Sequence, residues 1–169
     1  MRRPILVTLA FTIAMTAGAY AQQTALAVKT FMDDKEIMAL AEAAKADRKG
    51  DAPMVSKPIL SLAPYRASLE YRPGTGPAAV HEKDAELMVV IAGTGNIVTG
   101  GKLVDEKRSN ANNLSGSSIA DGTTQALAKG DMLIVPPNVP HQIIPTGGAP
   151  IVLMTMHIPY PPAGWPPAN

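Results

Sequence analysis

Residues 129–144, KGDMLIVPPNVPHQII, are the stretch from which the fold of this chain is predicted. A glycine and an aspartate turn the chain into the short apolar run 132–135, and two prolines end that run. Because proline has no backbone N–H to donate to a neighbouring strand, these prolines limit strand pairing and stiffen the approach to His141. Asn138, between the prolines and His141, is one of the few residues that tolerate a left-handed turn. A single imidazole held between rigid turns is a candidate ligand or acid–base group.

Outward from this stretch, the chain after Pro53 consists of short apolar runs separated by turns rich in Gly and Pro. Apolar and polar side chains alternate in residues 65–71, which predicts one packed face and one face toward water or a polar cavity. Helical connections of the kind that parallel strands require are missing between these runs, so we predict one all-β barrel or sandwich. Strands are expected at residues 58–63, 65–71, 86–92, 96–99, 132–135 and 151–158.

Two segments are expected to lack regular pairing. Residues 102–128 are rich in Ser, Asn, Gly and charge, which predicts a long loop or an irregular hairpin. Such a loop either serves a function or is a solvated excursion without one. Residues 159–169 are rich in Pro, and Trp165 is their only candidate anchor.

Ahead of the strands, residues 30–50 predict one helix. Asp33 and Glu36 have the spacing of a capping box, and Gly50 is placed as the glycine that follows a helix end. Apolar residues at helical spacing form one narrow stripe. The stripe indicates either a helix packed on the outside of the barrel or an arm that makes a dimer contact or regulates the protein.

The first 21 residues have the three regions of a secretory signal peptide. A pair of arginines is followed by an apolar core at residues 5–17 and by the small-x-small site Ala19-Tyr20-Ala21. The core is too short and wrongly flanked for a membrane span, so we expect a periplasmic or secreted protein cleaved near Ala21, rather than an uncleaved anchor. The chain then divides into a signal peptide (1–21), an N-terminal helical arm (22–55), a β-barrel (56–158) and a Pro-rich tail (159–169).

Composition narrows the possible functions. The chain has no Cys, which excludes disulfides and thiolate metal sites. Loss of the two signal-peptide arginines changes the formal net charge from +1 to −1. We therefore expect no nucleic acid and, after cleavage, no membrane surface as a partner. The residues that remain suffice for one domain with a core of its own.

The chemistry is concentrated in the three histidines of the chain, His81, His141 and His157. His81 ends one predicted strand, and Glu86 begins the next after a short turn. If these two strands pair as a hairpin, both side chains project from one face, and such a pair is how a divalent metal is often held. The facing of His157 is left open by its place in its strand, so it is either a further imidazole of the site or a solvated side chain.

Two segments resemble the two conserved motifs of the cupin superfamily: AAVHEKDAELMVVIAGTG and the stretch quoted first. The positions that match are His81, Glu86 and Gly93 in the first motif, and Gly130, Pro136, Asn138 (standing for a glycine) and His141 in the second. The chain is also similar to a narrower group of exported, single-domain bacterial cupins that share the wording HEK-x-AEL and VTGGKLVDEKR. The resemblance covers about residues 65–158 and implies a jelly-roll barrel, the double-stranded β-helix.

The chain departs from these motifs at ligand positions. Ala79 stands where the first motif has its first histidine, and Pro145 stands where the second motif has an asparagine. What the resemblance implies is therefore a metal site of His81, Glu86 and His141, with His157 as a further candidate. Two imidazoles and one carboxylate suit Fe(II), Mn(II), Ni(II) or Zn(II), with positions left open for water or substrate.

The resemblance implies a metal-dependent enzyme, such as a dioxygenase, isomerase, lyase or decarboxylase, that acts on a small oxygen-bearing molecule. The alternatives are a non-catalytic barrel that binds a small ligand or a metal, and a structural barrel whose histidines no longer bind metal. Arg66, Arg72 and Tyr71 are candidates for binding an anionic or aromatic substrate, unless they form an ordinary strand with one polar face. A homodimer is the oligomer expected from the resemblance and from the apolar helix.

Overall fold

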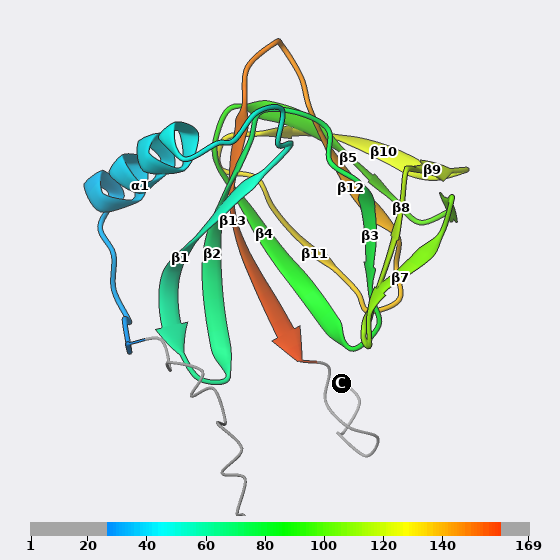
Figure 1. The fold of residues 1–169 in the computed structure, drawn as a ribbon, viewed down its shortest axis with the longest axis horizontal. Coiled ribbons are helices and arrows are strands. Elements are labelled where there is room, and N and C mark those ends of the chain that lie inside the picture. Colours follow the sequence, from blue (N-terminus) through cyan, green and yellow to red (C-terminus); the bar gives the residue numbers. More distant parts are fainter. Residues whose placement is uncertain (1–26, 160–169) are drawn as a thin grey trace, which may run out of the picture.

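A computed structural model describes residues 27–159, so the expected signal peptide and the tail beyond Pro159 lie outside the described residues. The described part consists of one helix, α1 (Asp34–Ala46), and thirteen strands. The strands form two facing sheets and a small ribbon, and α1 lies outside the barrel beside the first strands (Figure 1). No helix within residues 27–159 is long and apolar enough to cross a membrane.

Both large sheets are antiparallel. The first has five strands in the order β1 (Val55–Leu62), β2 (Tyr65–Arg72), β13 (Ile151–Pro159), β4 (Asp84–Ala92) and β11 (Met132–Val135). The second has six strands in the order β10 (Thr123–Ala128), β5 (Thr94–Thr99), β12 (His141–Pro145), β3 (Ala78–His81), β8 (Asn113–Gly116) and β7 (Lys107–Asn110). The ribbon pairs β6 (Lys102–Val104) with β9 (Ser118–Ala120).

The chain crosses repeatedly between the two large sheets: β3, β5, β10 and β12 lie in the second, and β4, β11 and β13 in the first. This interleaving is the jelly-roll topology. The prediction of an all-β barrel with an N-terminal helix is therefore confirmed.

The hairpin that was one way to bring His81 beside Glu86 does not form. β3 ends at His81 and pairs with β8 and β12 in the second sheet, whereas β4 pairs with β11 and β13 in the first sheet. Residues 82 and 83 carry the chain from one sheet to the other. The two side chains consequently approach each other across the interior of the barrel rather than from neighbouring strands.

Residues 102–128 do not form a long loop, because five strands lie within them, β6 to β10. The alternative, an irregular hairpin, agrees with residues 102–120, where β6 pairs with β9 and β7 pairs with β8. β10 pairs with β5 along its full length, and β8 pairs with β3. Their polar, Gly-rich sequences carry little strand preference of their own. Pairing with strands far away in the sequence fixes them instead. The strand β12 was not expected either, since His141 was placed behind a turn and not inside a strand.

The helix begins where its capping box places it. The backbone N–H of Glu36 donates to Asp33 Oδ1 at 2.8 Å, and the backbone N–H of Asp33 donates to Glu36 Oε2 at 3.0 Å. The helix ends earlier than predicted, at Ala46, with Asp47 as its C-cap. The Asp47 carboxylate pairs with Lys57 of β1, which fixes this end of the helix against the sheet. Gly50 is therefore not the glycine that follows the helix, but a turn residue with φ of +54°.

The apolar stripe of the helix packs on the outer face of the first sheet. Ala41 and Ala44 are buried there, and their small side chains allow the helix to lie close to β2. The stripe is thus covered within the chain itself, so it gives no support to the expected dimer. The buried residues of this outer cluster are Ala41, Ala44, Ile59, Ala67, Leu69, Tyr71 and Val152.

A second cluster fills the interior of the barrel between the two sheets. Its buried residues are Met88, Val90, Ile97, Leu127, Val135, Ile143, Ile151 and Leu153. Because the outer face of β2 belongs to the helix cluster, the other face of that strand is free to carry polar side chains inward. The alternation predicted for residues 65–71 is confirmed in this form.

The turn after β4 offers a test of the packing. Gly93 has φ of +82°, and a Cβ atom there would overlap the carbonyl oxygen of Pro150. Gly148 has a similar φ of +68° but faces open space. We expect Gly148→Ala to lower the free energy of unfolding by about 1 kcal/mol through backbone strain, and Gly93→Ala to lower it by about 3 kcal/mol through strain and overpacking. Urea unfolding of both variants measures this, and equal losses would contradict the described turn.

Candidate metal centre

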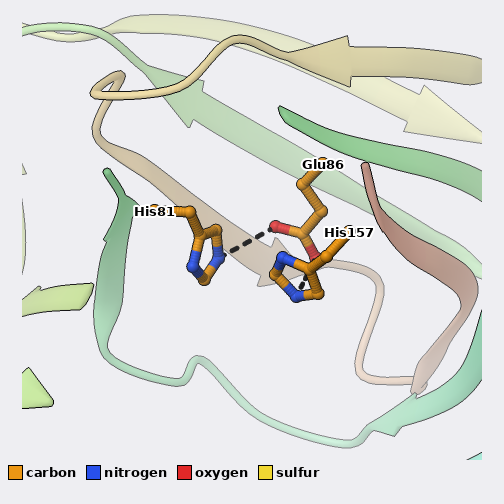
Figure 2. Close-up of side chains that lie close together, drawn as sticks. All are labelled: His81, Glu86 and His157. Atoms are coloured by element: carbon orange, nitrogen blue, oxygen red, sulfur yellow. Dashed lines mark ion pairs between the residues drawn. The ribbon is translucent and has the colours of Figure 1, made fainter. Parts of the chain in front are cut away.

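Four polar side chains converge at one end of the barrel interior. Glu86 of β4 and His157 of β13 are register partners on neighbouring strands of the first sheet. His81 at the end of β3 and His141 at the start of β12 belong to the second sheet. Figure 2 shows His81 and His157 directed toward the Glu86 carboxylate from different strands. The two sheets therefore each contribute to one cluster of three imidazoles around one carboxylate.

Distances place Glu86 at the centre of this cluster. His81 Nε2 lies 3.3 Å and His141 Nε2 lies 3.0 Å from the same atom, Glu86 Oε2. His157 Nε2 lies 3.9 Å from Glu86 Oε1. Potential ligand atoms of His81, Glu86 and His157 all lie within 4.8 Å of one another. The Glu86 side chain is only 4% exposed, whereas that of His157 is 45% exposed, so His157 lies on the solvent side of the cluster.

The stiff turn ahead of His141 also holds His81. Asn138 has the predicted left-handed backbone, with φ of +63°. Its backbone N–H donates to the carbonyl oxygen of His81 at 2.9 Å. The same turn is joined to the end of β5, because the N–H of Gly100 donates to the carbonyl oxygen of Pro140 at 2.9 Å. The two histidines are thus tied together through the backbone as well as through Glu86.

Both buried imidazoles are oriented by an acceptor on their other nitrogen. His81 Nδ1 lies 2.9 Å from Asn113 Oδ1, and His141 Nδ1 lies 3.1 Å from the carbonyl oxygen of Val139. An amide or carbonyl oxygen only accepts, so each Nδ1 carries a proton and donates it. In the neutral ring, Nε2 then has a lone pair, and in both rings this lone pair faces Glu86. Two lone pairs opposite a carboxylate oxygen require a positive charge between them, either protons or a metal ion.

The pKa shifts express the same requirement. Burial by itself lowers the pKa of His81, but hydrogen bonds with Glu86 and Asn113 and the charge of Glu86 outweigh it, so the pKa is raised above 6.5. Burial by itself raises the pKa of Glu86, but hydrogen bonds and charge from the surrounding histidines hold it far below its usual range. Glu86 is therefore a carboxylate at every pH near neutral.

A cavity of about 390 Å³ opens beside this cluster. Its wall is formed by His81, Glu86, His141 and His157 together with Pro53, Met54, Glu70, Arg72, Gly76, Pro77, Ala79, Gln142 and Ile143. The volume is of the size that holds a small molecule. The site therefore combines a set of potential metal ligands with space for a small ligand.

The structure brings together the three residues predicted as metal ligands, and it brings His157 to them. Among the residues predicted to bind substrate, only Arg72 borders the cavity. Arg66 is exposed and does not border it, and Tyr71 is buried in the outer cluster beneath the helix. The alternation of side chains along this strand already places Arg72 and Tyr71 on opposite faces of the sheet.

Two residues of the site were not identified from the sequence. Asn113, which orients His81, lies on β8, and no local signal predicts that β8 pairs with β3. Glu70 lines the cavity and could have been found, because it shares a face with Arg72 in the alternating strand. Ala79, the departure from the first motif, lies opposite His141 in the register and borders the cavity without offering a ligand.

Comparison with known proteins supports the fold. No protein-family model and no curated protein matches the chain. A protein with a double-stranded β-helix domain from Klebsiella pneumoniae is 16% identical, with a TM-score of 0.50 over 70% of this chain and 86% of that one. The Fe(II) form of HppE is 13% identical, with a TM-score of 0.50 over 66% of this chain and 54% of that one. A cupin 2 conserved barrel domain protein from Salinispora arenicola is 13% identical, with a TM-score of 0.47 over 78% of this chain and 89% of that one. The chain has a double-stranded β-helix fold.

The paired charges predict how stability depends on pH when chelator has removed any metal. The contribution of His81 is fully present below its ordinary pKa of 6.5 and is lost as pH rises through its raised pKa. The contribution of Glu86 is present above its ordinary pKa of 4.5 and is lost as pH falls toward its lowered pKa. We expect the Tm, measured by circular dichroism from pH 3 to 9, to fall on both sides of the interval between these values. In the variant His81→Gln the fall in Tm on the alkaline side should be smaller than in the wild-type protein. A fall of the same size in both proteins would contradict the pairing of His81 with Glu86.

Proposed function

We propose that this chain binds one divalent metal ion through His81, Glu86 and His141, with His157 as a fourth ligand, and that it is a metal-dependent enzyme for a small oxygen-bearing molecule. One observation carries the proposal. The lone pairs of two imidazoles, each fixed by a donated Nδ1 proton, face one oxygen of a buried carboxylate at 3.0 and 3.3 Å. A divalent cation bound among these groups would supply the positive charge that the two lone pairs and the carboxylate require.

The donor set fits such an ion. Three imidazole nitrogens and one carboxylate oxygen suit Fe(II), Mn(II), Ni(II) or Zn(II). Imidazoles that hold a metal almost always donate their other N–H to a carbonyl, a carboxylate or water, as His81 and His141 do here. The negative charge of Glu86 would offset part of the charge of the ion inside the barrel.

His157 is the proposed fourth ligand, and it lies on β13. Residue 79 of β3 is an alanine and offers no ligand. His157 reaches the cluster from β13, because it is the register partner of Glu86. The rings of His81 and His157 are in edge contact, with centroids 4.4 Å apart. The ligand set would then draw on four strands, two from each sheet.

A bound ion would supply Lewis-acid chemistry or a place for oxygen-bearing groups. The side chains around the cavity would hold the ligand in position and keep water away from it. Pro53, Met54 and Ile143 give the cavity apolar walls. Asn113 and the Val139 carbonyl hold the two buried rings in place while a ligand enters.

A non-catalytic ligand- or metal-binding barrel is the second candidate, and one observation favours it. Apart from the four groups of the centre, the titratable side chains that line the cavity are Glu70 and Arg72, and these two pair with each other. Within residues 27–159 every titratable side chain that lines the cavity outside the centre is thus part of an ion pair. Any reaction would have to depend on the metal itself.

Metal analysis of the chain, purified without a polyhistidine tag, tests the site. We expect near one equivalent of a divalent metal, and its loss in the double variant His81→Ala, His141→Ala, because one carboxylate and the exposed His157 hold such ions only weakly. Glu82→Gln serves as the matched control, since this acidic residue follows His81 but does not border the cavity. If the wild-type protein contains no metal, or if the double variant retains its metal, the proposed site is contradicted.

The same metal-loaded protein separates enzyme from binder. Turnover of catechols, enediols or organic acids that disappears in the double variant supports the enzyme. Tight binding across this panel without turnover supports the non-catalytic barrel.

A rescue experiment tests the fourth ligand. We expect His157→Ala to weaken metal binding by at least about tenfold, which is the lower end of what even indirect changes around metal sites cost. Ala79→His in that background should restore part of the loss, because residue 79 lies beside His141 in the register and borders the cavity. Competition with a chelator of known affinity measures both effects. Unchanged affinity in His157→Ala would reduce the site to three ligands.

A further inference from the structure

An ion pair inside the barrel has no part in the proposed metal centre. Arg72 donates from Nε and from Nη2 to a single oxygen, Glu70 Oε2, at 2.8 and 2.7 Å. The two side chains are only 14% and 11% exposed. They project from the inner face of β2, whose outer face packs under the helix, and both line the same cavity as the metal centre.

Stability alone does not account for this pair. Its register partners on β13 are Ile151 for Arg72 and Leu153 for Glu70, and both are fully buried in the core of the barrel. The pair therefore lies against an apolar floor. In such surroundings the cost of removing two charges from water offsets most of their attraction, so apolar residues would serve the fold as well.

The geometry of the pair leaves one acceptor and one donor unused. Because both bonds converge on Oε2, Glu70 Oε1 and Arg72 Nη1 have no hydrogen-bond partner in residues 27–159. No fully buried side-chain nitrogen or oxygen of the described residues lacks a partner, so these two atoms reach open space.

The charges decide what such a pair would bind. The positive charge of Arg72 is compensated by Glu70 at hydrogen-bond distance, so a carboxylate entering here would meet a repelling charge beside the attracting one. A hydroxyl group can accept from Nη1 and donate to Oε1 at the same time, and both bonds are charge-assisted. Arg72 would thus bind a neutral hydroxyl group of the ligand rather than an anionic group.

We propose that the Glu70–Arg72 pair is a binding subsite for a neutral hydroxyl group. The ligand of the cavity is then a small hydroxylated acid, with oxygen atoms held at the centre of His81, Glu86 and His141 and a hydroxyl at its far end. The assignment of the acid end rests on the proposed metal site. The assignment of the hydroxyl end rests on the ion pair alone.

Matched ligands that differ only at the far end test the proposal. On a four-carbon frame these are 2,4-dihydroxybutanoate, 2-hydroxybutanoate and malate, which end in a hydroxyl, a methyl and a carboxylate. The six-carbon set is 2,6-dihydroxyhexanoate, 2-hydroxyhexanoate and 2-hydroxyadipate. Calorimetric titration into the Mn(II)-loaded protein should show, at one of the two lengths, about tenfold or tighter binding of the hydroxyl-ended ligand, as expected for hydrogen bonds to charged groups.

Variants assign the preference to the pair. Arg72→Met and Glu70→Gln should each abolish the preference for the hydroxyl-ended ligand. Arg66→Met is the matched control, because Arg66 lies on the same strand but is exposed and does not border the cavity. If a single variant fails to fold, the double variant Glu70→Leu, Arg72→Met removes both charges together, and it should fold and show no preference.

Each outcome separates the subsite from the metal site. Tightest binding of the carboxylate-ended ligand would overturn the hydroxyl assignment, and so would a preference that survives in Arg72→Met. A metal-loaded protein without any preference at either length would overturn the subsite and leave the metal site intact. If the protein binds no metal, the same titrations of the metal-free protein decide the subsite: the preference should persist there, and its absence would overturn it.

Discussion

The buried carboxylate of Glu86 is the constraint on which the site depends. A negative charge in the interior of a barrel is costly unless positive charge surrounds it. In this chain three imidazoles on three different strands, from both sheets, lie around the carboxylate, and protons or a metal ion among them would supply that charge. The backbone bond from Asn138 to His81 and the side-chain bond from Asn113 to the same ring fix its position. The two groups that fix His81, the backbone N–H of Asn138 and the side chain of Asn113, thus come from residues that are not themselves ligands.

The strand β2 shows how a small domain can have both an apolar core and a polar cavity. Its outward residues join the helix cluster, and its inward residues Glu70 and Arg72 line the cavity. The helix α1 therefore offsets part of the free-energy cost of the polar interior, because it provides a second apolar surface for the first sheet. On the neighbouring strand β13, the register partners of Arg72 and Glu70 are Ile151 and Leu153, which are buried in the apolar cluster of the interior.

Ala79 and His157 are the two positions that distinguish the proposed centre from the cupin motifs that the sequence resembles. Ala79 and His157 lie on opposite sheets, and each borders the cavity beside one of the buried ligands. Residue 79 is the register partner of His141, and His157 is the register partner of Glu86, so each lies next to a residue of the proposed centre.

The sequence by itself determined the features that depend on neighbouring residues: the strands at 65–71 and 132–135, the capping box of the helix, the left-handed Asn138, and the spacing that singled out His81, Glu86 and His141. The tertiary structure alone decided which strands pair. It turned the polar residues 102–128 into strands, placed Asn113 behind His81, and brought His157 to Glu86. The physical reason is that register joins residues far apart in the chain, and a slip of one residue moves every side chain to the other face.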